Sequence, residues 1–197
     1  MKIIKLKLNK TTTEHIEVII DFLKRGKVIV YPTDTVYGLG CLATDMEAVR
    51  KISRIKQRPV GQAYLILIDS LIMAKKYAFI NTKQEKYLAK IWPGPVTVVL
   101  SSRGNLPLEV TGGKDTIAIR LPKSEFLGKI IGAVKVPIIS TSVNLSGDEN
   151  IPALADLEKY FKKDKPDLVI DAGPAKSKKS SRLIDLTDIG NIKILRH

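Results

Sequence analysis

Residues 44–59, TDMEAVRKISRIKQRP, run a helical pattern into two basic residues that stand two positions apart just before a proline. A Thr-x-x-Glu capping box opens the pattern, and its apolar residues recur with helical spacing. Pro59 disfavours the α conformation for Arg58 and favours an extended one. Because residues i and i+2 share one side of an extended segment, Lys56 and Arg58 are predicted to point the same way just beyond a helix.

This Lys-x-Arg pair has two interpretations. A lysine and an arginine that face one ligand are suited to binding a polyphosphate, since both offer charged N–H donors. Alternatively, basic residues near the C-terminus of a helix only complement the helix dipole. The spacing of Lys56 and Arg58 does not decide between them.

Outward from this stretch, segments with strand character alternate with helical ones along most of the chain, and strands gather at its end. This order predicts an α/β fold with a twisted, mixed parallel and antiparallel sheet flanked by helices, formed by one domain over residues 1–197. The strands are expected at 3–8, 27–31, 63–68, 96–100, 116–120, 137–140, 168–171, 182–186 and 192–195. The helices are expected at 15–25, 44–56, 70–77, 81–92, 126–134 and 152–161.

The composition is that of a globular protein with an excess of positive charge. Apolar residues make up 44% of the 197 residues, and 33 Lys and Arg against 20 Asp and Glu give a net charge of +13. Such an excess favours an anionic partner such as a nucleotide or RNA. The aromatic fraction of 6% does not indicate a base-stacking surface for single strands.

Cys41 is the single cysteine, so no internal disulfide can form, which fits a reducing, cytoplasmic environment. The N-terminus alternates lysine with apolar residues and has no signal-peptide core. No apolar run approaches the length of a membrane span. The two histidines, His15 and His197, stand without neighbouring metal ligands, so no protein metal site is predicted.

The motif Gly38-x-Gly40-x-x-Ala43 imitates a dinucleotide-binding fingerprint. It begins too far beyond the preceding strand, however, and the acidic residue expected about 20 positions later is missing. We therefore expect these glycines only to let the backbone turn. A P-loop sequence is also missing, so the chemistry is expected to depend on hydroxyls, amides and cations.

A hydroxyl-rich segment, Ser140–Asn144, follows a predicted buried strand. Ser142 and Asn144 stand two positions apart and would face one ligand if the chain is extended there. The alternative is ordinary turn chemistry, for which serine and asparagine are common choices. Hydroxyl and amide groups next to a cationic pair would suit charge stabilisation at phosphorus.

Six motifs, in order, resemble those of the YrdC/Sua5 family of L-threonylcarbamoyladenylate synthases, most closely its short form, TsaC. They are YPTDTVYGLG (31–40), KQRP (56–59), WPGPVT (92–97), TIAIRLP (116–122), STSVNLSG (140–147) and ILRH (194–197). The Lys-x-Arg and Ser-x-Asn pairs together are the signature of that family, and the motifs span nearly the whole chain.

The resemblance implies a YrdC-like domain with a basic concave groove, and a nucleotidyltransferase that uses ATP, L-threonine and bicarbonate. It would release pyrophosphate and supply threonylcarbamoyl-AMP for the t6A modification at position 37 of tRNA, with partner proteins that complete t6A and with Mg²⁺ accompanying ATP. Lys56 and Arg58 would be the catalytic residues. By motif position the ATP-binding residues would be Lys56, Arg58, Gln62, Thr116, Ser142, Asn144, Asn150 and Arg196. The threonine-binding residues would be Thr35, Arg120, Ser140 and Ser181.

Some positions depart from the family pattern. Leu67 stands where long forms often carry a histidine, and Asn150 replaces a serine. Ser181 is followed by Arg182 in place of threonine, and Gln62 would stand in for an asparagine.

The other function compatible with the sequence is a non-catalytic module that binds double-stranded RNA or tRNA on a basic surface. The net charge of +13 motivates it, with Lys178, Lys179 and Arg182 as a local patch. Binding of that kind would weaken steeply with salt and would not depend on threonine.

Overall fold

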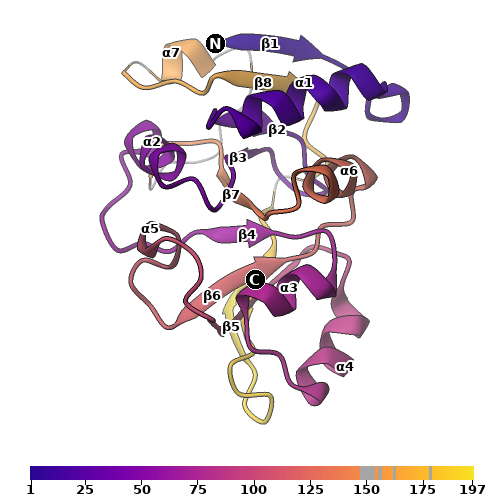
Figure 1. Cartoon of the computed structure of the whole chain (residues 1–197), viewed down its shortest axis with the longest axis vertical. Coiled ribbons are helices and arrows are strands. Elements are labelled where there is room, and N and C mark those ends of the chain that lie inside the picture. Colours follow the sequence, from indigo (N-terminus) through magenta and orange to yellow (C-terminus); the bar gives the residue numbers. More distant parts are fainter. Residues whose placement is uncertain (147–153, 155–156, 162, 178) are drawn as a thin grey trace.

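The computed structural model describes residues 1–146, 154, 157–161, 163–177 and 179–197, without the side chains of residues 158 and 159. The described chain forms a sheet whose ten strands lie in the order β1-β8-β2-β3-β7-β4-β6-β5-β9-β10 (Figure 1). The strands are β1 (Lys2–Lys5), β2 (Ile29–Tyr31), β3 (Gly38–Gly40), β4 (Leu65–Leu67), β5 (Val96–Ser101), β6 (Thr116–Arg120), β7 (Ile138–Ser142), β8 (Leu168–Asp171), β9 (Arg182–Asp185) and β10 (Lys193–Arg196).

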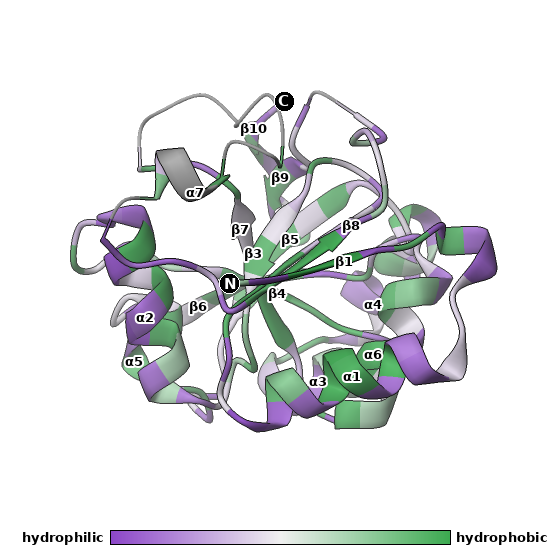
Figure 2. Ribbon diagram, turned by 90° about the horizontal axis from the view of Figure 1, so that it is seen from above, coloured by the Kyte–Doolittle hydropathy of each residue, from purple (hydrophilic) through white to green (hydrophobic). Residues whose placement is uncertain are grey.

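Helices connect these strands and cover part of the sheet. They are α1 (Thr13–Lys24), α2 (Met46–Lys56), α3 (Leu71–Tyr77), α4 (Thr82–Ile91), α5 (Leu108–Thr111), α6 (Glu125–Val134) and α7 (Leu157–Tyr160), with a 3₁₀ turn η1 (Leu8–Lys10). Seen from above, α1, α3 and α6 lie together on one side of the strands, and α7, β9 and β10 border the other (Figure 2). No described helix combines the length and the apolarity that a membrane span requires.

The sheet is mixed, as predicted. Strand β8 is parallel to both β1 and β2, and β4–β6 and β5–β9 are also parallel pairs. The remaining neighbours are antiparallel. The α/β prediction is confirmed, and the continuous sheet supports our proposal that residues 1–197 form a single domain.

The register of the central strands places three isoleucines on one face of the sheet and several predicted site residues on the other. Ile66 pairs with Ile139 on one side and with Ile119 on the other, and all three are buried. Because side chains alternate between the two faces, their neighbours along the strands point the opposite way. The pairing of β4 with β6 and β7 therefore places Ser140 and Arg120 on the second face, two strands apart, together with Ser142 and Thr116.

Most predicted elements are present, with differences at their ends. Helix α1 is capped by Thr12, whose side chain accepts from the backbone of His15, and α2 is capped by Asp45. The cap predicted at Thr44 is therefore wrong by one residue, because the carboxylate of Asp45 reaches the N–H of Ala48. Residues 101–115, where no helix or strand was predicted, contain α5, and the helix expected at 152–161 lies partly outside the described residues.

The prediction that Gly38 and Gly40 only allow a turn is wrong, because both lie in strand β3. The ring of Tyr31 lies across them, and its hydroxyl donates to the carbonyl oxygen of Ile139 at 2.9 Å. A Cβ on Gly38 would lie 2.9 Å from both the Tyr31 ring and the Ser140 hydroxyl, and one on Gly40 would collide with the Ile139 carbonyl. These glycines make room for a buried aromatic ring and for close strand contact.

Candidate functional site

The site begins where α2 ends. Gln57 adopts a left-handed conformation with φ of 50°, and its N–H closes the last turn of the helix. This tight reversal, which the sequence did not predict, separates Lys56 from Arg58. Lys56 is 2% exposed and turns into the protein, whereas Arg58 is half-buried.

The ammonium group of Lys56 binds the Ser-x-Asn segment directly. Its Nζ donates to the carbonyl oxygen of Ser142 at 2.7 Å, and to the carbonyl oxygen and Oδ1 of Asn144 at 2.8 Å each. A lysine ammonium has three N–H groups, so all of its donors are engaged. Oδ1 of Asn144 also accepts from the hydroxyl of Ser142 at 2.6 Å. Lys56 thus fixes the turn that carries Ser142 and Asn144.

Burial shapes the protonation of this lysine. Removal from water, with a smaller contribution from the charge of Arg58, lowers the pKa of Lys56 to about 7. The acceptors around its ammonium are carbonyl and amide oxygens rather than carboxylates. The charge is therefore stabilised by dipoles alone among the described contacts.

Arg58 is held differently. Its Nη2 donates to the carbonyl of Ala63 at 2.7 Å and its Nε to that of Gln62 at 3.3 Å, while the guanidinium lies 4.5 Å from the centre of the Tyr64 ring. These contacts among the described residues use two of the five N–H groups of the arginine, and three remain for a ligand. The side chain of Gln62 is exposed, and only its backbone contributes here.

A second cluster surrounds Arg120 at the end of β6. Its guanidinium, 4% exposed, donates from Nη2 to Asp34 at 2.6 Å, from Nη1 to the hydroxyl of Thr35 at 3.0 Å, and from Nε to the carbonyl of Gly94 at 3.1 Å. Burial lowers the pKa of Arg120, while the charge of Asp34 opposes that shift. Within the described contacts, two N–H groups of Arg120 remain free.

Ser181 and Arg196 complete this cluster from the C-terminal strands. The hydroxyl of Ser181 is 2.7 Å from that of Thr97, and its carbonyl accepts from Nη2 of Arg196 at 2.8 Å. Burial lowers the pKa of Arg196, and the nearby charge of Arg120 lowers it further. The two arginines therefore lie close enough to influence each other.

The family model for Sua5, YciO and YrdC proteins, described as "Telomere recombination", matches residues 21–197. The chain belongs to this family.

Sequence relatives in the family carry a common name. The threonylcarbamoyl-AMP synthase of Pyrococcus abyssi is 36% identical over 174 residues, which is 88% of this chain and 51% of that protein. The chain thus spans about half the length of this relative. The putative threonylcarbamoyl-AMP synthase of Methanocaldococcus jannaschii is 34% identical over 187 residues, 93% of this chain and 87% of that protein.

Solved structures agree with this assignment. Escherichia coli YciO superposes with a TM-score of 0.88 at 28% identity, over 100% of this chain and 96% of that one. This match extends over nearly the full length of both chains. Pyrococcus abyssi Sua5 in complex with L-threonine superposes with a TM-score of 0.86 at 33% identity, over 94% of this chain and 54% of that one.

The family motif YPTDTVYGLG is tied to the segment that precedes β9. The backbone N–H of Ser177 donates to the carbonyl of Thr35 at 3.1 Å, and the hydroxyl of Tyr37 donates to the carbonyl of Gly173 at 2.7 Å. Residues 173–177 therefore lie against the loop that supplies Thr35. The sequence did not indicate this contact.

The structure brings most of the predicted site residues into two clusters. Lys56, Ser142 and Asn144 form one, and Thr35, Arg120, Ser181 and Arg196 form the other. Asn150, and Lys178 of the basic patch, lie outside the described residues. Sequence reasoning missed Asp34 and Thr97, although both stand inside quoted motifs, because nothing in their spacing identifies their partners.

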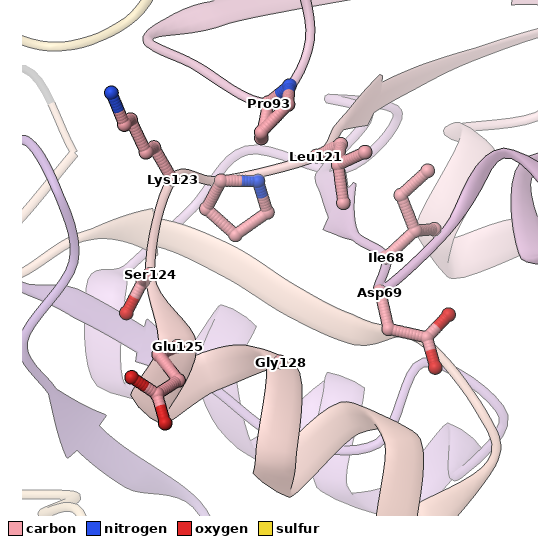
Figure 3. Close-up of a pocket in the computed structure, with 9 residues that line it drawn as sticks. Ile68, Asp69, Pro93, Leu121, Lys123, Ser124, Glu125 and Gly128 are labelled. Carbon is pink, nitrogen blue, oxygen red and sulfur yellow. The ribbon is translucent and has the colours of Figure 1, made fainter.

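A cavity of about 360 Å³ lies elsewhere, at the N-terminal turn of α6 beyond the ends of β4 and β6 (Figure 3). Its walls combine apolar and charged side chains, with Asp69 and Glu125 placed apart from each other across the opening. It is lined by Ile68, Asp69, Pro93, Leu121, Pro122, Lys123, Ser124, Glu125 and Gly128. None of the predicted site residues is among them.

Proposed function

We propose that this chain is a threonylcarbamoyl-AMP synthase, which makes L-threonylcarbamoyladenylate and pyrophosphate from L-threonine, bicarbonate and ATP for the t6A modification of tRNA. The observation that carries the proposal is the contact of the Lys56 ammonium with Ser142 and Asn144. It joins the two signature pairs of the family, which stand 86 and 88 residues apart in the chain, into one site. The names of the sequence relatives support the same activity.

On the ATP side, Arg58 is the proposed phosphate contact. Three of its N–H groups have no partner among the described residues, and a planar guanidinium suits bidentate binding of phosphate. Ser142, on the same face of the sheet as Arg120, would contact the nucleotide next to it. The further proposed ATP contacts are Gln62, Thr116, Asn144, Asn150 and Arg196, with Lys56 holding the turn.

On the amino-acid side, Arg120 is the proposed partner of the threonine carboxylate. Its two remaining N–H groups match the two oxygens of one carboxylate. The hydroxyls of Thr35, Ser140 and Ser181 would complete the pocket; Thr35 and Ser181 are 5% and 3% exposed. The threonine complex of the Pyrococcus abyssi relative supports an amino-acid site in this fold.

The proposed reaction has two steps. The threonine amine loses a proton and adds to CO₂ derived from bicarbonate, which gives a carbamate. A carbamate oxygen then attacks the α-phosphorus of ATP, and the bond from that phosphorus to pyrophosphate breaks. The contribution of the protein is to hold two anions together and to neutralise the phosphates, chiefly through Arg58 and Arg196.

Mg²⁺ is the proposed companion of ATP. No three His, Cys, Asp or Glu side chains in the described part of the chain gather to hold an ion. The residues present therefore fit a Mg²⁺ bound through phosphate oxygens and water, a mode that needs few protein carboxylates. When bound, the ion would offset phosphate charge.

The test is release of pyrophosphate from ATP by the purified protein. We expect release that requires both L-threonine and bicarbonate, with L-serine far less effective. Calorimetry should show that ATP and threonine strengthen each other's binding. Arg58→Ala should lower the rate at least a hundredfold with little change in Tm, whereas Arg54→Ala, which removes an exposed arginine of α2, should leave the rate unchanged. Pyrophosphate release independent of threonine would overturn the proposal.

We further propose that the product passes to t6A-completing partner proteins in the cytoplasm, a location consistent with the buried, unpaired Cys41. Direct contact with tRNA is a proposal that rests on the net charge of +13. It does not compete with catalysis, since RNA contact would assist delivery of the adenylate.

A further inference from the structure

Asp34 is the carboxylate that pairs with Arg120, and its role follows from its position rather than from any motif assignment. The pair is nearly inaccessible to solvent, with side-chain exposures of 4% for Arg120 and 10% for Asp34. Oδ1 of Asp34 accepts from Nη2 of Arg120 at 2.6 Å, and Oδ2 accepts from the backbone N–H of Lys123 at 3.0 Å. A single carboxylate therefore bridges the arginine and the chain that follows it.

The pair sets the orientation of Arg120. Asp34 holds Nη2, Thr35 holds Nη1 and Gly94 holds Nε, so all three guanidinium nitrogens are fixed by two separate segments of the chain. The plane of the group cannot rotate without breaking at least two of these bonds. Of the N–H groups that remain, one is on Nη1 and one is on Nη2, a number that matches the two oxygens of a carboxylate.

The pair also sets the charge of the site. The described cations near it include Arg120 itself, Arg196, whose pKa the charge of Arg120 lowers, and the exposed Lys123. Asp34 is the anion in direct contact with Arg120 and cancels its charge locally. An arginine whose charge is compensated attracts a simple carboxylate less than an uncompensated arginine would. The binding of a zwitterion, which carries its own ammonium group, is weakened less by the same compensation.

We propose that Asp34 is the positioning and specificity residue of the amino-acid site, which makes Arg120 select a zwitterionic α-amino acid over a carboxylic acid that lacks the amine. This inference rests on the proposed function and deepens it. Because only the amine can become a carbamate, a site that admits simple hydroxy acids would be blocked by unreactive ligands. Asp34 reduces that inhibition while it leaves the carboxylate-binding N–H groups in place.

The experiment compares L-threonine with 3-hydroxybutyrate, which keeps the carboxylate and hydroxyl and lacks the amine. The threonine KM and the inhibition constant of 3-hydroxybutyrate are measured by pyrophosphate release. Asp34→Asn removes the charge and keeps the size of the side chain. We expect the preference for threonine over 3-hydroxybutyrate to fall at least tenfold in this variant, with the KM for ATP unchanged.

The matched control is Asp167→Asn. Asp167 also binds one cationic side chain, Lys51, at 2.7 Å and one backbone N–H, that of Val28, at 2.8 Å, but it lies at the other end of the sheet next to β8. The Asp167→Asn variant should have a lower Tm, as the Asp34→Asn variant does, and an unchanged preference for threonine over 3-hydroxybutyrate. Equal changes of preference in both variants would overturn the inference.

Asp34→Glu separates orientation from charge and serves where Asp34→Asn does not fold. It keeps the anion but displaces Arg120 by one methylene, so we expect the threonine KM to rise about tenfold while the preference ratio stays near that of the wild type. An unchanged threonine KM in Asp34→Glu, or an unchanged ratio in folded Asp34→Asn, would overturn the inference alone. A wild-type protein without threonine-dependent release would overturn the proposed function as well.

Discussion

The two cations of the Lys-x-Arg pair have different proposed roles because their N–H donors differ in number and geometry. The ammonium of Lys56 is a compact charge whose three N–H groups are all taken by the turn at Ser142 and Asn144. Arg58 has a larger planar group. Two carbonyl oxygens accept from two of its N–H groups and an aromatic ring lies near the guanidinium, so the other N–H groups remain for a ligand among the described contacts. We therefore assign the turn to Lys56 and the phosphate to Arg58.

Lys56→Met tests this division of roles. The variant keeps most of the length of the side chain but removes the Nζ donor from the carbonyl oxygens of Ser142 and Asn144 and from Oδ1 of Asn144, so we expect a loss of about 2–4 kcal/mol of folding free energy and a Tm lower by roughly 5–15 °C. Activity should fall at least as far as in Arg58→Ala, whose Tm should stay near that of the wild type. Thermal unfolding followed by circular dichroism measures the difference. Equal Tm values for Lys56→Met and the wild type would contradict the structural role of Lys56.

The lowered pKa of Lys56 leads to a second prediction at the residue scale, which concerns how the stability of the protein depends on pH. A group with a folded pKa of about 7, below its ordinary 10.5, binds fewer protons in the folded than in the unfolded state between these two pH values. The free energy of unfolding that depends on Lys56 therefore rises with pH from about 7 to about 10. Below pH 7 both states are protonated and the dependence vanishes.

Urea unfolding of the wild type and Lys56→Met at pH 7 and pH 9.5 measures this effect, because the methionine variant cannot titrate there. We expect the stability difference between the two proteins to be larger at pH 9.5. A difference that is the same at both pH values would mean that the pKa of Lys56 is not lowered.

At the scale of elements, strand β3 packs closely against Tyr31 and β7. Its two glycines accommodate the ring of Tyr31 and allow β3 to lie directly beside β7, which carries Ser140 and Ser142. Close packing of this kind tolerates no added methyl group when the neighbouring atoms belong to the backbone. The position of the Ser-x-Asn turn therefore depends on an element that carries no site side chain of its own.

Gly40→Ala should destabilise the protein by about 3 kcal/mol or more, since the new Cβ would meet the carbonyl oxygen of Ile139. Gly128→Ala is the control: it lies within α6, where a Cβ meets nothing within 4 Å, and should stabilise the protein by about 0.5–1 kcal/mol. Urea denaturation gives both values. A Gly40→Ala protein as stable as the wild type would show that β3 and β7 can move apart.

At the scale of the whole molecule, the excess of positive charge is a property that no single residue explains. A net charge of +13 attracts polyanions through many weak contacts, whichever residues form the site. Charge-driven binding of this kind releases counterions from the nucleic acid, and its affinity therefore follows the salt concentration.

We expect the protein to bind unmodified tRNA with an affinity that falls at least tenfold between about 50 and 200 mM salt. The KM for threonine should change much less over that range, because Arg120 is buried and paired. Filter binding and pyrophosphate release measure the two quantities. Affinity for tRNA that is insensitive to salt would exclude a mainly electrostatic contact.

The sequence by itself determined most of the order of helices and strands, apart from β3 and α5, together with the α/β class and the Lys-x-Arg and Ser-x-Asn pairs, because these depend on spacing over a few residues. The tertiary structure alone decided the saturation of Lys56, the buried pair of Asp34 with Arg120 and the contact of Thr97 with Ser181. The partners of these contacts stand 84 to 88 residues apart in the chain. They meet only because the sheet places β3 beside β7 and β5 beside β9, and strand order is a property of the packed core that local patterns do not encode.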